Sequence, residues 1–161
     1  MRITLLIMLF MIATSCNQTN SNKALQARLD SLESKYTETY KPGFGEFMTS
    51  IQLHHAKLWF AGINNNWKLA DFEIHEIQET LDDIQKFNTD RPETKSIVMI
   101  YPALDSVNHA IAQHNSQQFK SSFIFLTNTC NSCHRATEHE FNVVIIPSNP
   151  PTSNQSFEPL H

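Results

Sequence analysis

Apolar side chains recur at helical spacing through almost the whole stretch from residue 23 to residue 139. In each run they stand three or four positions apart, which is the pattern of a helix with one buried face. The chain holds only three glycines, and its breaks are marked by proline, asparagine and other polar residues. This pattern predicts an all-α protein and argues against a β-rich fold.

Four core helices are expected, at residues 44–62, 67–87, 94–114 and 117–139. Pro102 should kink or restart the third of them, because proline lacks the amide hydrogen that a helix interior uses. Since the connections are short, the helices are expected to form an antiparallel up-down four-helix bundle. The second helix also carries acidic residues that are expected to face mostly water, namely Glu73, Glu76, Glu79, Asp82 and Asp83.

Two segments flank the bundle, which is expected to span residues 44–139. Residues 23–41 are expected to form an extra N-terminal amphipathic helix with a seam typical of a short coiled coil, made by Leu25, Leu29, Leu32 and Tyr36. Residues 140–161 are expected to form an extended C-terminal tail, because an apolar run gives way there to proline, serine and asparagine. The tail is predicted to lie over the bundle, with about its last ten residues open to disorder.

The motif Cys130-Asn131-Ser132-Cys133-His134, near the end of the last core helix, is the attachment signature of c-type haem. In that chemistry the two thiols form thioether bonds with the haem vinyl groups, and the histidine ligates iron. A redox dithiol would be expected within a βαβ pattern, which this sequence does not show. A zinc site would need a second cysteine pair or a spaced histidine pair. The motif therefore predicts one covalently attached haem c.

The two motif cysteines lie on the apolar face of their own helix. That face is made by residues that follow one another at intervals of three or four positions, namely Phe119, Phe123, Leu126, Cys130 and Cys133. A group attached to these cysteines would therefore be packed into the bundle rather than held on its surface.

The N-terminus has the pattern of a secretory signal peptide over residues 1–15, with a positive start and an apolar run too short to span a bilayer. Small residues then precede Cys16, as in a bacterial lipoprotein signal, in which this cysteine becomes the lipidated first residue. Ordinary cleavage nearby, with Cys16 as a free thiol, is the alternative. Residues 16–22 would form a lipidated tether, so the protein is expected to be exported and anchored to a bacterial membrane, facing the periplasm or the cell exterior.

Acidic residues outnumber basic ones, with 16 Asp and Glu against 12 Lys and Arg. No basic cluster stands out along the chain, so a nucleic-acid partner is not expected. Cysteine use is complete if Cys16 takes lipid and the motif takes haem, because no pair then remains for a disulfide.

The residue opposite His134 would decide what the iron does. In an up-down bundle the first core helix runs antiparallel to the fourth, so Met48 and His134 lie at matching depths, counted at about 1.5 Å per residue. Met48 also lies on the apolar face, and its thioether is a known partner to a haem histidine. His55 shares that face roughly 10 Å further along, and His54 lies at its edge. Met48 is the expected distal ligand, with His55, His54 or no protein ligand as alternatives.

Four helices with a CxxCH motif near the end of the fourth resemble the cytochrome c-prime family, a four-helix bundle with haem bound between its helices. The resemblance covers roughly residues 44–139, and the first helix and the tail are additions to the pattern. Relatives in that family divide into a methionine-ligated branch and a branch with no sixth protein ligand. Arg135 resembles the basic residue often found after the histidine, which implies a contact with the proximal histidine or a haem propionate; a solvated arginine is the alternative.

Two classes of function follow from the haem. The first is a membrane-anchored single-electron carrier, whose partners are other redox proteins. The second is a gas-binding or sensing protein with an open distal site, with Met48 as a lid and His55 as a distal donor. An enzyme such as a peroxidase is not expected, because the distal face is apolar apart from His55. The seam of residues 23–41 adds a homodimer or a coiled-coil partner as a further expectation.

Overall fold

A computed structural model describes residues 21–36 and 42–160 of the 161-residue chain. Within these residues the regular secondary structure is helical and contains no strand, which confirms the all-α prediction. The expected signal peptide, Cys16 with most of its tether, and residues 37–41 of the first predicted helix lie outside the described residues. Residues before and after position 42 belong to two separate units.

In the first unit, residues 21–36 form a helix, as expected from the amphipathic pattern. All of its residues are exposed, including the seam of Leu25, Leu29, Leu32 and Tyr36. An exposed apolar seam is what one helix of a coiled coil presents, and the pairing predicted for this segment stays a prediction.

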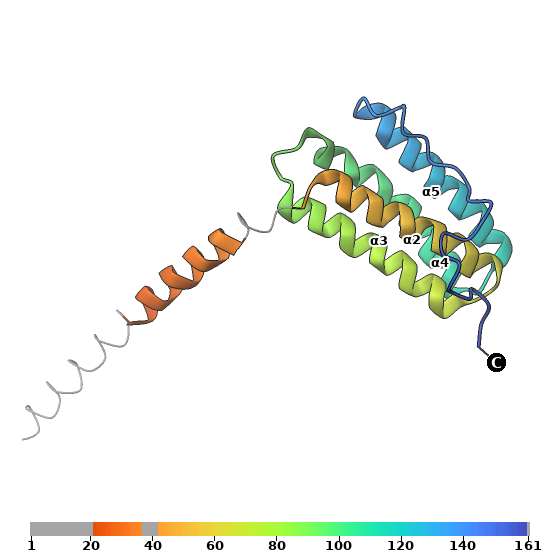
Figure 1. The fold of residues 1–161 in the computed structure, drawn as a ribbon, viewed down its shortest axis with the longest axis horizontal. Helices are drawn as coiled ribbons and strands as arrows, with labels where there is room; N and C mark the ends of the chain where they lie inside the picture. The colour runs from red at the N-terminus through yellow and green to blue at the C-terminus, as the bar shows by residue number, and fades with distance from the viewer. Residues whose placement is uncertain (1–20, 37–41, 161) are drawn as a thin grey trace, which may run out of the picture. The chain divides into compact units, whose positions relative to one another are not determined.

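In its described part, the second unit contains four α-helices and one 3-10 helix (Figure 1). Three of the connections are only a few residues long. The elements are, in order, α2 (Phe44–Ile63), α3 (Trp67–Phe87), η1 (Pro92–Ile100), α4 (Tyr101–Ala112) and α5 (Ser116–Ala136). The bounds of α2 and α3 agree closely with the helices expected at residues 44–62 and 67–87.

The helix starts follow local capping chemistry. The Glu46 carboxylate accepts a hydrogen bond of 2.9 Å from the Gly43 backbone N–H at the start of α2. Asn66 caps α3 by accepting from the Leu69 N–H, and Asn115 caps α5 by accepting from the Gln118 N–H. Each side-chain oxygen satisfies an amide that has no partner inside the helix. Asn115 therefore marks the break between α4 and α5.

The third expected helix is divided, as its proline predicted. Residues 92–100 wind as a 3-10 helix with Pro92 at its start, and the α-helix begins only at Tyr101. Pro102 then occupies the first turn of α4, where its missing amide hydrogen would have had no intrahelical partner.

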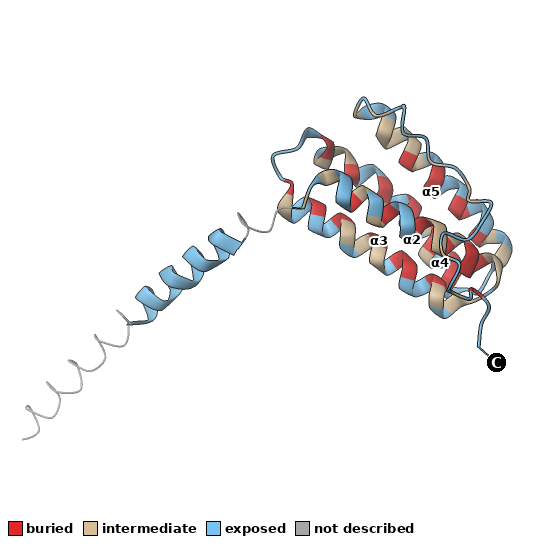
Figure 2. Cartoon of the chain, in the orientation of Figure 1, coloured by how far each residue is buried: buried red, intermediate tan, exposed pale blue. Residues whose placement is uncertain are grey.

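The helices of this unit pack around one core (Figure 2). α2 contacts α3 and α5, α4 contacts α3 and α5, and η1 packs against α3, α4 and α5. At one end of the α2–α5 contact, a Cβ on Gly62 would overlap the Phe119 ring, so the absence of a side chain lets the two helices meet there. None of the described helices is long and apolar enough to cross a membrane.

One acidic residue of α3 is an exception to the expectation that these side chains mostly face water. Glu73 is fully buried between α2 and α3. Its Oε2 lies 2.7 Å from His54 Nδ1, and its Oε1 lies 3.8 Å from Lys57 Nζ. A buried carboxylate needs such partners, because losing water without them would be costly. The sequence of α3 did not indicate this burial, because the partners of Glu73 come from α2.

The tail after α5 folds back over the unit and follows an irregular path (Figure 1). α5 ends at Ala136, three residues earlier than expected, and Glu138, with a φ of 61°, reverses the chain. Near the C-terminus Phe157 is buried and its ring centroid lies 5.6 Å from that of Phe60. The Glu158 carbonyl accepts a hydrogen bond from Asn66. These contacts hold the end of the tail, so it is ordered rather than free.

Candidate functional site

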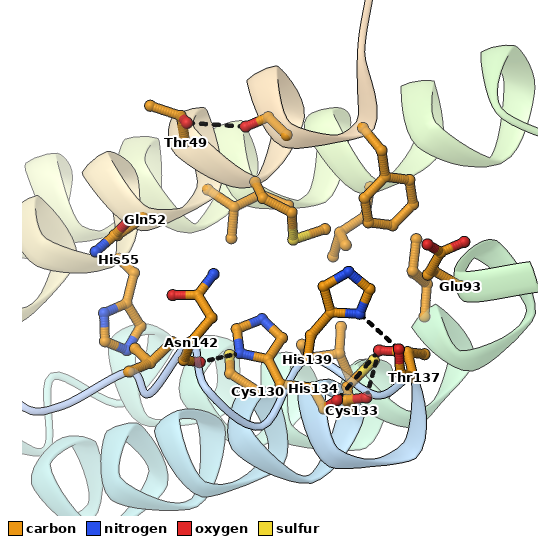
Figure 3. A pocket seen from close by; sticks show the side chains of 18 of the residues that line it. Thr49, Gln52, His55, Glu93, Cys130, Cys133, His134, Thr137, His139 and Asn142 are labelled. Atoms are coloured by element: carbon orange, nitrogen blue, oxygen red, sulfur yellow. Dashed lines mark hydrogen bonds between the residues drawn. The ribbon is translucent and has the colours of Figure 1, made fainter. Parts of the chain in front are cut away.

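A cavity of about 250 Å³ lies between α2 and α5, with η1, α3 and the tail completing its wall (Figure 3). It brings together most of the residues that the sequence assigns to the haem. These are Met48 and His55 from α2 and Cys130, Cys133 and His134 from α5. Arg135 is not among the lining residues and is exposed, with its guanidinium 2.9 Å from Ser132 Oγ. The structure therefore places Arg135 on the surface of α5.

The two cysteines stand on the cavity side of α5. Cys130 is buried and Cys133 is half-buried, and both are free thiols. Burial, reinforced by the neighbouring Cys133, raises the pKa of Cys130 to about 12, and burial also raises the pKa of Cys133. Both groups are therefore neutral thiols at physiological pH. A redox dithiol needs the opposite shift, because its chemistry runs through the thiolate.

His134 is oriented by the tail. Its Nδ1 lies 2.6 Å from the backbone carbonyl of Asn142, eight residues further along the chain (Figure 3). A carbonyl oxygen only accepts hydrogen bonds, so Nδ1 must carry the proton. In the neutral imidazole this leaves the lone pair on Nε2. Metal-ligating histidines are typically held in this way, with the second nitrogen donating to a carbonyl or carboxylate.

Met48 approaches the cavity from α2. It is half-buried, packs against the core and lies one turn after the capped start of that helix. Phe44, four residues before Met48, and Ile51, three residues after it, line the same wall. The thioether of Met48 thus lies in an apolar surround, on the helix that faces the one bearing His134.

His55 lies deeper, against the packed core. It is buried, its ring centroid is 4.4 Å from that of Phe123, and its Nε2 is 2.9 Å from Thr127 Oγ1. Thr127 donates its one hydroxyl proton to the Phe123 carbonyl, so its oxygen accepts from Nε2–H of His55. The lone pair of neutral His55 is then on Nδ1. Burial lowers the pKa of His55 to about 4, so the ring is neutral at physiological pH.

A polar group at one end of the cavity was not foreseen from the sequence. Arg91 and Glu93, at the start of η1, and His139, just beyond α5, all line the cavity. Arg91 Nη2 lies 2.9 Å from Glu93 Oε1. A hydrogen bond from its own backbone amide, together with Arg91 and His139, outweighs burial and lowers the pKa of the Glu93 carboxyl. The sequence carried no signal for this cluster, because Arg91 and Glu93 lie in the break between helices.

His139 enters that polar group from the turn that follows α5. The left-handed turn at Glu138 returns the chain toward α5, and the His139 N–H donates to the His134 carbonyl at 2.7 Å. Its Nδ1 lies 2.5 Å from the Thr137 carbonyl, and its ring lies in the space between the two helix walls (Figure 3). His139 thus belongs to the cavity. His54 is paired with Glu73 and does not line it.

The residues of the cavity fit a covalently attached haem by the chemistry of their groups. Two neutral thiols stand at the motif spacing on one helix, followed by an imidazole whose Nε2 carries a lone pair, and a thioether lies on the facing helix. A haem iron takes one or two protein ligands. Across residues 21–36 and 42–160 no three His, Cys, Asp or Glu side chains gather as a metal-binding group by themselves.

The chain was compared with known protein families, with curated proteins and with solved structures. None of the three comparisons finds a match. What can be concluded about function therefore rests on the residues of this cavity and on the motif that they contain.

Proposed function

We propose that the protein is a membrane-anchored monohaem c-type cytochrome that carries single electrons. Haem would be attached through Cys130 and Cys133, with His134 as the proximal ligand and Met48 as the distal one. The observation that carries the proposal is the hydrogen bond between His134 Nδ1 and the Asn142 carbonyl, in a cavity that both motif cysteines line. It leaves Nε2 as the nitrogen available to a metal.

The proposal includes a fold of the cytochrome c-prime kind, an antiparallel up-down bundle of α2, α3, α4 and α5. Support comes from the contacts of α2 with α3, α3 with α4, α4 with α5 and α5 with α2, which close a ring of helices. The motif lies near the C-terminal end of the last helix, as the resemblance requires. Haem bound in the cavity would supply a one-electron couple between ferric and ferrous iron.

The chain's own residues would control that couple. Met48 would hold the distal position with a neutral thioether, which favours the reduced state. Ile51, Ile97 and Ile100 line the cavity with hydrocarbon and would keep water from it. His134, held by the tail, would stay in one orientation, so little rearrangement would accompany electron transfer.

The proposed location follows from the N-terminal sequence. Export by residues 1–15 and lipidation of Cys16 would anchor the protein to a bacterial membrane, facing the periplasm or the exterior, where it would meet other redox proteins. The seam of residues 21–36 could pair with a second copy or another helix.

A gas-binding or sensing protein with an open distal position is the second candidate. The observation that favours it is the burial of His55 in the same cavity. Its hydrogen bond to Thr127 argues against the simplest version, because Nε2–H is already donated and Nδ1 has no proton to give a bound gas. A carrier is therefore the better-supported function.

Haem attachment can be tested by acid extraction of the denatured protein. Wild-type protein should keep its haem, because thioether bonds survive denaturation. A Cys130→Ser, Cys133→Ser variant should release it, and Ser132→Ala, within the same motif, should behave as wild type. Complete release of haem from the wild-type protein would refute the attachment.

The distal ligand can be tested by the absorption spectrum of the ferrous protein before and after carbon monoxide. The wild type should be low-spin and unchanged by the gas. Met48→Ala should become high-spin and bind the gas, whereas Met99→Ala, at an exposed methionine of η1, should not. A ready shift of the wild-type spectrum would move gas binding ahead of electron transfer.

A further inference from the structure

The tail reaches His134 through an attachment that lies inside the motif itself. Asn131, the residue after the first cysteine, donates from Nδ2 to the Val144 carbonyl at 2.8 Å. Its Oδ1 accepts from the Val144 N–H, also at 2.8 Å. The side-chain amide thus engages both backbone groups of one tail residue, as a neighbouring β-strand would.

This attachment lies close to the hydrogen bond on the histidine. Asn131 and His134 are three positions apart on α5, so they lie on one side of the helix. Asn142, at a bend of the tail, and Val144 are two positions apart, and their carbonyls accept from His134 and Asn131 on that side of α5. Holding Val144 therefore holds Asn142 where its carbonyl can accept from His134 Nδ1.

The tail has little else to hold it at this point. Residues 143–147 have no regular secondary structure, so their backbone groups must find partners outside a ladder or a helix. Phe141, Val143 and Ile145 are exposed, while Val144 and Ile146 pack against the core. The packing of these two half-buried aliphatic side chains does not fix the orientation of the tail backbone. The two hydrogen bonds to Asn131 fix it.

We propose that Asn131 is a positioning residue for the proximal histidine. By anchoring Val144 it presents the Asn142 carbonyl to His134, which keeps the proton on Nδ1 and the lone pair on Nε2. A histidine that donates in this way is a stronger base toward a metal, so it stabilises the oxidised state and lowers the reduction potential. This second effect rests on the proposed haem function, and the first does not.

The experiment compares Asn131→Ala with Ser132→Ala in the full chain prepared without haem. Ser132 is the matched control, because it is the other variable residue of the motif and its hydroxyl donates to the Asn128 carbonyl of its own helix. Amide hydrogen exchange at Val144 and nitrogen NMR of the His134 ring are measured. Asn131→Ala should speed the exchange at least about tenfold and mix the two ring tautomers, since two hydrogen bonds are lost. Ser132→Ala should change neither.

Asn131→Asp separates the two bonds of the anchor. The aspartate still accepts from the Val144 N–H but donates nothing to its carbonyl, so exchange at Val144 should fall between the wild type and Asn131→Ala. Equal exchange and equal tautomer ratios in Asn131→Ala and Ser132→Ala would overturn the proposal, because packing of Val144 and Ile146 would then suffice.

The haem-loaded protein tests the second effect separately. Asn131→Ala should raise the reduction potential above that of the wild type and of Ser132→Ala. A released tail with an unchanged potential would overturn the link from Asn131 to the iron. A chain that takes up no covalent haem would refute the proposed function, whereas the haem-free measurements would still decide whether Asn131 positions His134.

Discussion

The two ends of the α2–α5 pair are built differently. At one end Gly62 of α2 admits the ring of Phe119 of α5, which is fully buried. Trp59 and Phe123 lie around that ring, with centroids 6.3 and 5.9 Å from it. At the other end the same two helices face each other across a cavity of about 250 Å³.

Within this helix pair, one end is built for stability and the other end is built to hold a bound group. The end around Phe119, called the closed end below, is filled with aromatic rings, so it should carry much of the free energy of folding. The cavity end has small thiols on α5 and a half-buried methionine on α2, so it leaves room for a bound group. His55 lies at the boundary, where its ring is tilted against that of Phe123 and it lines the cavity.

The largest expected effect is the loss of a ring at the closed end. Phe119→Ala should lower the free energy of unfolding by about 3–5 kcal/mol, because it leaves a void among packed rings. Phe44→Ala, at the cavity end, should cost only about 1–2 kcal/mol, because that side chain is half-buried beside existing space. Urea denaturation of both variants measures the two losses. Equal losses would break the comparison.

The second effect is a pH dependence at the boundary. The pKa of His55 is about 4 in the folded chain and 6.5 in the reference state, so the unfolded chain binds a proton more readily between these values. Stability should therefore be full above about pH 6.5 and fall as the pH drops toward 4, by up to about 3 kcal/mol.

Denaturation of the haem-free protein across this pH range, beside a His55→Gln variant, measures the contribution of the histidine. The variant should be less stable near neutral pH, and its stability should fall less steeply between pH 6.5 and 4. A wild type and variant with parallel pH profiles would show that His55 is not the group responsible.

The third effect uses two glycines of the same helix. Gly62→Ala should destabilise by about 1–3 kcal/mol, because the new Cβ would overlap the Phe119 ring. Gly45→Ala, at the cavity end, meets nothing within 4 Å and should stabilise by about 0.5–1 kcal/mol, since alanine favours a helix. Thermal unfolding of the pair should therefore show shifts of opposite sign. Shifts of the same sign would mean that α2 is packed alike at both ends.

The smallest effect on stability is expected at Arg135, which lies on the surface near the cavity end. Arg135 is exposed, and its guanidinium donates a hydrogen bond to Ser132 of its own helix. Arg135→Ala should change the free energy of unfolding by less than about 0.5 kcal/mol and leave the visible spectrum unchanged. A shifted potential in this variant would instead support the proximal or propionate contact that the family resemblance implies.

Much of the fold could be predicted because its signals are local. The apolar period predicted α2 and α3 closely, and it placed the start of the last core helix within one residue of the observed start of α5. Met48 and His134, which the depth argument paired, both line one cavity. The ligation of iron by these two residues stays a prediction.

Other features could not be predicted because they join distant parts of the chain. Glu73 is buried only because His54 and Lys57 arrive from another helix. Glu93 lines the cavity because η1 begins beside it. The residues around Glu93 in the sequence show no apolar helical period that would have predicted its burial. The Asn142 carbonyl is a backbone group, and no residue type at that position signals its role.

The sequence by itself determined the helices, their caps and the helix face on which the two thiols and Met48 lie, because periodicity and capping depend on neighbours within a few residues. Only the tertiary structure decided that α2 and α5 close at Gly62 and separate at Cys130, and that the tail returns to orient His134. The physical reason is that packing and backbone hydrogen bonds between distant segments depend on which parts of the folded chain lie next to each other. Spacing along a single helix does not contain that information.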